Sequence, residues 1–198
     1  MKPVLLFTIA TILCLSGLWF GWRADTQLHI WIFDVGQGDG IFIRTPSGLT
    51  ILVDGGPGDA VLSELGSTLP PWVHELDVVV LTHPHADHYE GLFEIVDRYE
   101  VGMFLVPEVC EYDSVSQELL EKVNFENVKL VYVSQEVGVS MVSGGDLCVL
   151  SVSIYGDFGE SRDRSDVNGC SLVVSVEYGT FHALLTGDLT QSGEESLL

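Results

Sequence analysis

The segment 77–81 (DVVVL) limits the fold more than any other part of the sequence, because every position after the first is apolar. Side chains of a strand alternate between two faces, so an uninterrupted apolar run predicts a strand in a sheet that is covered on both sides. Other short β-rich runs lie between glycine-rich turns. The expected strands are 28–33, 41–44, 50–53, 77–81, 103–106, 128–133, 147–154, 171–177 and 181–185.

Two segments show helical instead of alternating periodicity. In 89–99, Leu92, Ile95 and Val96 lie on one helical face, and at the start of 113–125 Asp113 or Ser114 is suited to cap the first turn. Strands and helices together predict one layered α/β domain over 25–198, with mixed sheets inside and helices outside. The chemistry is then expected on loops at strand ends.

An uncharged apolar segment precedes this domain. Residues 3–22 contain no charged side chain, and Lys2 and Arg23 flank them. About 20 apolar residues are enough to cross a bilayer as a helix, so we interpret 1–24 as a membrane anchor. A cleavable signal peptide is the alternative, although the run is long for one and no small-x-small cleavage site follows it. Both interpretations place the domain outside the cytoplasm.

The loop after the strand at 77–81 carries the strongest functional signal. It reads LTHPHADH and brings His83, His85, Asp87 and His88 together. Imidazole and carboxylate are the usual zinc ligands besides thiolate. His83 and His85 point the same way in an extended chain and suit one metal, whereas Asp87 and His88 can face a second metal if the chain turns into a helix. We therefore expect two divalent metal ions, zinc or manganese.

Two further carboxylates end apolar strands. Asp188 follows the strand at 181–185 and is suited to bridge two cations, although Thr186 or Asp188 could instead cap a helix that begins near Leu189. Asp54 follows the strand at 50–53. It either orients metal ligands from behind them or forms a tight turn, and the sequence leaves both interpretations open.

In this order the motifs resemble those of the metallo-β-lactamase superfamily, in which H-x-H-x-D-H is the defining motif. More narrowly, the chain is similar to the extracellular hydrolase domain of the ComEC competence family. The matching segments are DVGQGD at 34–39, LVDGG at 52–56, LTHPHADH at 81–88, NGCSLV at 168–173 and LTGDL at 185–189. The resemblance implies a four-layer αβ/βα sandwich, preceded here by one N-terminal apolar helix.

The resemblance also implies roles for individual residues. The metal ligands are expected to be His83, His85, Asp87, His88 and Asp188. Asp87 and Asp54 are expected to serve catalysis, Asp87 by orienting the attacking hydroxide and Asp54 by supporting the histidines. Candidate substrate-binding residues are Gln37, Asp39, Asn168 and Ser171.

The sequence departs from the superfamily pattern at two places. Many members carry a further histidine between the H-x-H-x-D-H loop and the Gly-Asp strand, where this sequence offers Asn168 and Ser171. Members also carry a late His-His-Gly-Ser run, and this sequence ends at Leu198 before any such run. We therefore expect the C-terminal part of the sandwich to be missing and the second metal to bind weakly.

Charge and cysteine content add two expectations. The formal net charge is −21, from 29 acidic against eight basic residues, and it is typical of proteins from salt-loving organisms. At 1 M salt the Debye length falls to about 3 Å, which screens most of the self-repulsion. The domain carries Cys110, Cys148 and Cys170, which allow one disulfide but fit no zinc-thiolate site.

The leading hypothesis is a metal-dependent hydrolase that acts on phosphodiesters. The ComEC resemblance points to DNA, but nucleic-acid binding relies on basic residues, which are few here, and Arg44, Arg162 and Arg164 are the best candidates. A nucleotide or an envelope phosphodiester is therefore a rival substrate. The alternative hypothesis is a membrane-anchored accessory module without turnover. Hydrolysis of β-lactams has only superfamily-level support. His29, His74 and His182 are expected to be structural.

Overall fold

The computed structural model describes residues 2–23, 27–134, 139–145, 148–155 and 167–195. For residues 2, 18–23, 139–145, 148–155 and 192 it describes the backbone alone. Arg162 and Arg164 lie outside the described residues.

The larger sheet has six strands in the order β1-β2-β3-β4-β5-β6. Strands β1, β2 and β3 are antiparallel neighbours, and β3 to β6 run parallel. The parallel strands are apolar on both faces, as expected for a covered sheet. The bounds are β1 (His29–Ile32), β2 (Ile41–Arg44), β3 (Thr50–Val53), β4 (Glu75–Val80), β5 (Glu100–Pro107) and β6 (Lys129–Val133).

The smaller sheet has four antiparallel strands in the order β10-β9-β8-β7. Their bounds are β7 (Val139–Gly145), β8 (Cys148–Tyr155), β9 (Val173–Tyr178) and β10 (Phe181–Leu185). A short helix, α5 (Gln191–Glu195), follows β10.

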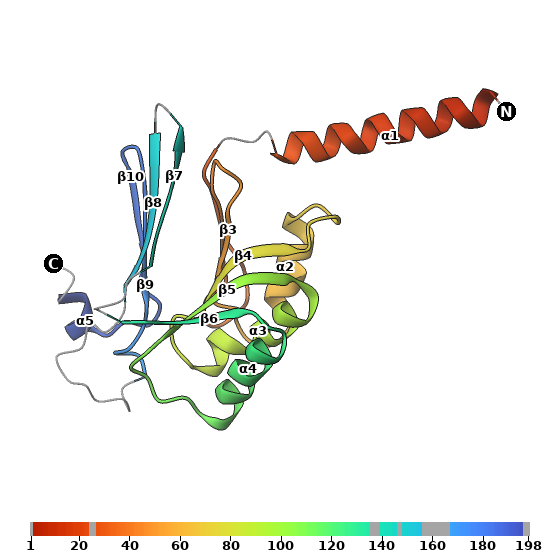
Figure 1. Ribbon diagram of the computed structural model, residues 1–198. Helices are drawn as coiled ribbons and strands as arrows, with labels where there is room; N and C mark the ends of the chain where they lie inside the picture. Colours follow the sequence, from red (N-terminus) through yellow and green to blue (C-terminus); the bar gives the residue numbers. More distant parts are fainter. Residues whose placement is uncertain (1, 24–26, 135–138, 146–147, 156–166, 196–198) are drawn as a thin grey trace.

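The two faces of the larger sheet bury two separate cores. Helices α2 (Ala60–Thr68), α3 (Ala86–Arg98) and α4 (Ser114–Phe125) cover one face, and the smaller sheet covers the other (Figure 1). Leu52, Val79 and Phe104 point to the helices, whereas Ile51, Val78 and Leu105 point to the second sheet. This alternation explains the continuous apolar runs, and the mixed α/β sandwich predicted from the sequence is confirmed.

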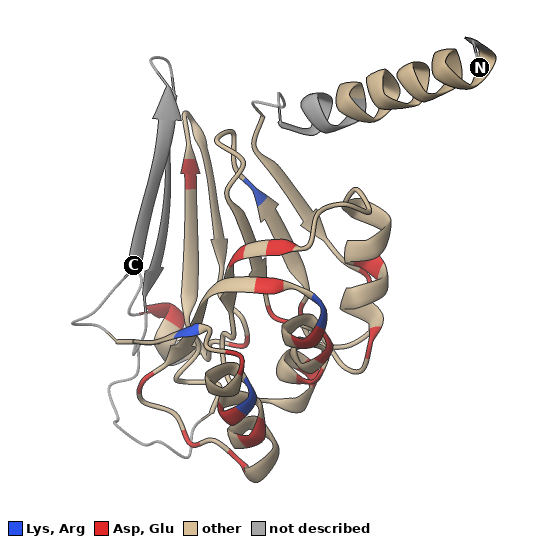
Figure 2. Ribbon diagram, turned by 45° about the vertical axis from the view of Figure 1, so that its right-hand side comes forward, with Lys and Arg blue, Asp and Glu red and all other residues tan. Residues whose placement is uncertain are grey.

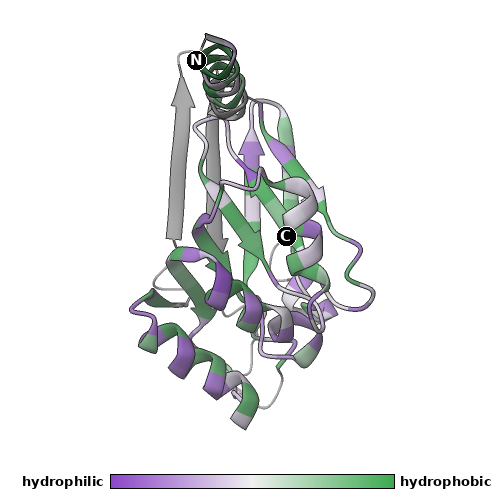
Figure 3. Ribbon diagram, turned by 90° about the vertical axis from the view of Figure 1, so that its right-hand side faces the viewer, coloured by the Kyte–Doolittle hydropathy of each residue, from purple (hydrophilic) through white to green (hydrophobic). Residues whose placement is uncertain are grey.

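Helix α1 (Lys2–Arg23) projects from the domain (Figure 1). Most of its described side chains are apolar and exposed, including Val4, Leu6 and Phe7. In Figure 3, which colours the ribbon by hydropathy, the described part of α1 is largely green. Within the searched, described part of the chain, no helix combines the length and apolar content of a membrane span. The membrane anchor over 1–24 stays a prediction.

The structure adds elements that periodicity did not predict. Helix α2 buries only Val61 and Leu65 along its nine residues, so its apolar signal is short. Strand β7 ends in two glycines, and glycine is uncommon in strands. Helix α3 begins at Ala86, earlier than the predicted 89, because His85 has an extended backbone and occupies the N-cap position.

A candidate metal centre at the strand ends

Three strand ends form the site. Parallel strands β3 and β4 end side by side, so Asp54 and the His83 loop follow at the same edge of the larger sheet. The backbone N–H of Asp54 donates to the carbonyl of Val80 over 2.9 Å, which joins the two loops. Asp188 comes to the same edge from the smaller sheet, two residues beyond the Thr186 that follows β10. The fold therefore gathers residues that are far apart in the sequence.

Thr82 joins the two sheets at this edge. Its carbonyl accepts a hydrogen bond from the backbone N–H of Leu172 over 2.9 Å. Gly187 has a φ of +52°, and a Cβ placed on it would lie 2.9 Å from Thr82 Oγ1. The turn that carries Asp188 thus rests directly against Thr82, which requires glycine both for its φ and for the close contact.

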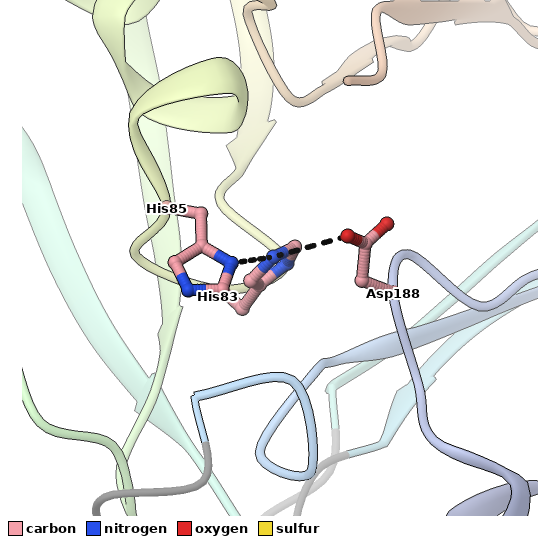
Figure 4. Close-up of side chains that lie close together, drawn as sticks. All are labelled: His83, His85 and Asp188. Atoms are coloured by element: carbon pink, nitrogen blue, oxygen red, sulfur yellow. Dashed lines mark hydrogen bonds and ion pairs between the residues drawn. The ribbon is translucent and has the colours of Figure 1, made fainter. Parts of the chain in front are cut away.

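His83, His85 and Asp188 form the first group of possible metal ligands. Figure 4 shows the two imidazole rings and the carboxylate converging from the loops after β4 and β10. His83 Nε2 lies 3.0 Å from His85 Nδ1 and 3.9 Å from Asp188 Oδ2. Two nitrogens on one tetrahedral zinc ion are roughly 3.3 Å apart, given zinc–nitrogen distances of about 2.0–2.1 Å. The spacing fits a shared ion.

His88 presents a second ligand atom to the other side of Asp188. Its Nδ1 lies 2.8 Å from Asp54 Oδ2, so this nitrogen is occupied. Its Nε2 is buried, lies 3.6 Å from Asp188 Oδ1 and has no hydrogen-bond partner among the described residues. A buried, unsatisfied nitrogen is costly in a protein interior, and a metal ion would satisfy it. The residues present therefore fit a divalent metal.

Asp54 is connected by hydrogen bonds to two of the three candidate-ligand histidines, directly to His88 and through Thr82 to His83. It is fully buried and accepts hydrogen bonds from the N–H of Thr82 (2.8 Å), from Thr82 Oγ1 (2.6 Å) and from His88. Because Thr82 Oγ1 donates to Asp54, it is left to accept from His83 Nδ1, 3.1 Å away. Both Nδ1 atoms then carry the proton, and both Nε2 lone pairs face Asp188.

Asp54 also forms a turn, with a φ of +58°. Asp and Asn adopt this conformation more readily than most residues. Asp54 therefore forms the turn and also hydrogen-bonds to His88, while its role in orienting metal ligands stays a prediction. Thr82 is the supporting residue that the sequence analysis missed, and its position directly before His83 was the available signal.

Burial and neighbouring charges set the protonation of the histidines. Burial, with the nearby His88 and His85, lowers the pKa of His83 to about 3, so this imidazole stays neutral. Burial alone would lower the pKa of His88, but the hydrogen bond and charge of Asp54, with Asp188 and Asp39, give a net rise. A neutral imidazole is the form that binds metals, so His83 is ready to do so at neutral pH.

The remaining predicted ligand and catalytic residue, Asp87, lies in the first turn of α3 and outside both groups of possible ligands. Its role stays a prediction. Asp39, predicted for substrate binding, instead joins Asp54 and His88 in the second group. Burial raises the pKa of Asp39 above its usual value. Attraction by His88 lowers this pKa, repulsion by Asp188 and Asp87 raises it further, and the net pKa is raised.

The other substrate-binding candidates belong to neither of the two groups of possible metal ligands. Gln37 is exposed on the loop before β2. Asn168 Oδ1 and Ser171 Oγ are buried without hydrogen-bond partners among the described residues. Ser171 directly precedes Leu172, which bonds to Thr82, so its loop borders the histidine loop. Their roles stay predictions.

Cys110 and Cys170 form a disulfide, with their Cα atoms 5.7 Å apart. It ties the loop after β5 to the loop of Ser171. The structure thus selects one pairing from the three cysteines of the domain, and Cys14 is free.

The other three histidines lie apart from these groups. His29 stacks on Trp31, with ring centroids 5.1 Å apart, and His182 is exposed near Glu177. His74 lines a cavity of about 760 Å³ at the opposite end of β4, together with Arg44 and Trp72. Arg44 is itself buried, so it offers little surface to a nucleic acid.

Residues 50–197 match the family model of the beta-lactamase superfamily domain. The chain is 25% identical over 184 residues to ComE operon protein 3 of Bacillus subtilis (strain 168), covering 84% of this chain and 23% of that protein. It is 24% identical over 174 residues to the competence protein ComA of Neisseria gonorrhoeae, covering 88% and 22%. The chain thus spans less than a quarter of either relative.

Among solved structures, the chain is similar to a Thermotoga maritima protein described as a candidate metallo-beta-lactamase. The TM-score is 0.51 at 12% identity, with 86% of this chain and 90% of that chain covered. At this identity the likeness concerns the fold alone.

Proposed function

The chain belongs to the metallo-β-lactamase superfamily, and on this premise we propose that it is a phosphodiesterase with two metal ions, zinc or manganese, that acts outside the cytoplasm. The observation that carries the proposal is the position of Asp188. One of its oxygens faces His83 and the other faces His88, at 3.9 and 3.6 Å. A carboxylate between two sets of imidazole nitrogens is suited to bridge two cations.

Each residue of the site would have its own role in binding or positioning the ions. His83 and His85 would hold one ion, His88 the other, and Asp188 both. When bound, such ions polarise a phosphoryl oxygen and lower the pKa of a bound water toward about 7. Asp54 and Thr82 keep the histidine nitrogens aimed at the site. Asp87, at the start of α3, would orient the attacking water from the rim.

The substrate we propose is a small phosphodiester or a short single strand, and not long duplex DNA. The competence proteins among the relatives support a phosphodiester. Figure 2 shows acidic residues spread over the helices and strands with few basic ones between them. Two of the basic residues are already paired with acidic neighbours, Arg98 with Glu94 and Lys122 with Asp97. Duplex DNA would meet a repulsive surface.

A turnover assay on the full chain tests this function. The metal-loaded protein, in molar salt, would be offered bis(4-nitrophenyl) phosphate, linear DNA and a chromogenic β-lactam. We expect hydrolysis of the diester, its loss in His85→Ala, and unchanged turnover in His182→Ala, which removes an exposed histidine outside the site. Bound metal without turnover of any phosphodiester would instead support the non-catalytic accessory module.

We propose further that α1 attaches the domain to a membrane. The exposed apolar side chains of α1, such as Leu5 and Leu13, support this. Helices that are apolar all round are found in apolar surroundings. We expect the full chain to sediment with lipid vesicles and a chain without 1–24 to stay in the supernatant. Equal partitioning of the two would contradict the attachment.

A further inference from the structure

The loop that carries Asp39 is locked onto the start of α3. Phe33 N–H donates to the carbonyl of Gly40 over 2.8 Å, which closes the base of the loop. At its tip, Gly38 has a φ of +72°, and a Cβ placed there would overlap the carbonyl oxygen of Asp87. The backbone of the loop therefore touches the helix turn from which His88 points into the site. Asp39, next in sequence, is fixed relative to His88.

Asp39 has more acceptor capacity left for a cation than its neighbour Asp54 has. The two carboxylates and His88 offer ligand atoms that all lie within 4.8 Å of one another. Asp54 already accepts three hydrogen bonds from Thr82 and His88. Among the described residues, no N–H or O–H group donates to the carboxylate of Asp39. Of these two, Asp39 is the one with oxygens left for a cation.

The neighbouring carboxylates make a positive charge beside Asp39 electrostatically favourable. Asp87 and Asp188 repel its carboxylate, and His88 is the attracting side chain. His88 Nε2 is itself fully buried and unpartnered among the described residues. A divalent cation would satisfy this nitrogen and neutralise the converging carboxylates together. Carboxylate and imidazole are compatible ligands of both zinc and manganese.

We propose that Asp39 is a direct metal ligand, which binds the second metal ion together with His88. The inference rests on the proposed two-metal function and deepens it, because it assigns a further ligand to the ion proposed to lie between His88 and Asp188. Asp39 supplies an anionic oxygen from the loop before β2. Asp54 remains a positioning residue behind His88.

Metal content separates this inference from the function on which it rests. The full chain and its variants would be loaded with zinc, dialysed in high salt and measured by elemental analysis. We expect about two ions in the native chain. Asp39→Asn should retain about one, and Asp34→Asn, in the same loop but exposed and outside both groups, should retain two. His85→Ala should lose the other ion.

A spectroscopic test distinguishes a ligand from a residue that acts through others. In a Cys14→Ser background, Asp39→Cys loaded with cobalt(II) should gain a sulfur-to-cobalt charge-transfer band, because only a directly bound thiolate gives one. Asp34→Cys should give none. Two retained ions in Asp39→Asn and no band in Asp39→Cys would overturn the ligation by Asp39 and leave the proposed function standing. A native chain that binds no metal would overturn both.

Discussion

The Nδ1 atom of His88 lies 2.8 Å from the Oδ2 atom of Asp54, and neither side chain is exposed to solvent. The same carboxylate reaches His83 through Thr82. One buried residue thus determines which nitrogen of His83 and of His88 carries the proton. In metal sites, groups that hold ligands in this way typically contribute 10–100-fold to metal affinity.

Asp54→Asn should therefore weaken metal binding by about 10–100-fold. Asparagine tolerates the positive φ, so the turn survives, but its NH₂ group replaces an acceptor with a donor. Leaving buried donors unsatisfied should also lower the free energy of unfolding by about 1–3 kcal/mol. Competition with a chelating dye measures the first effect, and denaturant unfolding measures the second.

Asp77→Asn is the matched control. Asp77 Oδ2 accepts from the N–H and the hydroxyl of Thr50, each over 2.8 Å, which repeats the Asp54–Thr82 arrangement at the opposite end of the sheet. The hydrogen bonds found for the Asp77 side chain within the described part of the chain all join it to Thr50. This variant should lose stability and keep its metal affinity. Equal loss of affinity in both variants would mean that Asp54 acts only through stability.

The group of candidate ligands around His83 could be predicted from the sequence because His83, His85 and His88 lie within six residues, directly after one apolar strand. The position of Asp39 could not, because it depends on how one loop packs against a helix that lies elsewhere in the chain. The same holds for the Cys110–Cys170 pair, whose connectivity is set by the meeting of two loops. The periodicity of apolar residues in a sequence indicates which face of a strand is buried. Contacts between loops that are distant in the sequence produce no such pattern.

Gly38→Ala should disturb the site although it removes no functional group. The new Cβ would overlap the carbonyl oxygen of Asp87 and push the Asp39 loop away from α3. We expect weaker metal binding together with lower stability. Gly36→Ala is the control, since Gly36 also has a positive φ, +88°, but open space around it. It should show only the strain of the backbone, about 1 kcal/mol. Equal metal affinities in the two variants would argue against the packing effect.

Removing the disulfide should destabilise the domain without removing any ligand. Cys110 and Cys170 are 60 residues apart, and a crosslink across such a loop stabilises by about 4 kcal/mol in the loop-entropy estimate. The double variant Cys110→Ala/Cys170→Ala should melt roughly 10 °C lower. Cys14→Ser, which removes the exposed free thiol, should melt as the native chain does. Insensitivity of the native melting temperature to reductant would indicate that the bond contributes nothing.

The N-cap of α4 gives the chain a pH-dependent contribution to stability. Asp113 accepts hydrogen bonds from the N–H of Ser116 (2.7 Å) and from Tyr89. Burial alone would raise the pKa of Asp113, but the bonds from Ser116 and Tyr89 outweigh it, and the net pKa is lowered. A carboxyl group whose pKa is lower in the folded than in the unfolded state stabilises the folded state at pH values above its unfolded pKa, about 3.9. This stabilisation is lost as the pH falls through the pKa of the folded state.

Two variants separate the cap from its charge. Asp113→Ala should lose about 1 kcal/mol at pH 7, because alanine is a poor N-cap. Asp113→Asn keeps a good cap that cannot titrate. The stability of the native chain relative to Asp113→Asn should therefore decline as the pH is lowered below about 4, measured by denaturant unfolding at each pH. A difference that grows on acidification would contradict the sign, because the cap would then stabilise the protonated carboxyl.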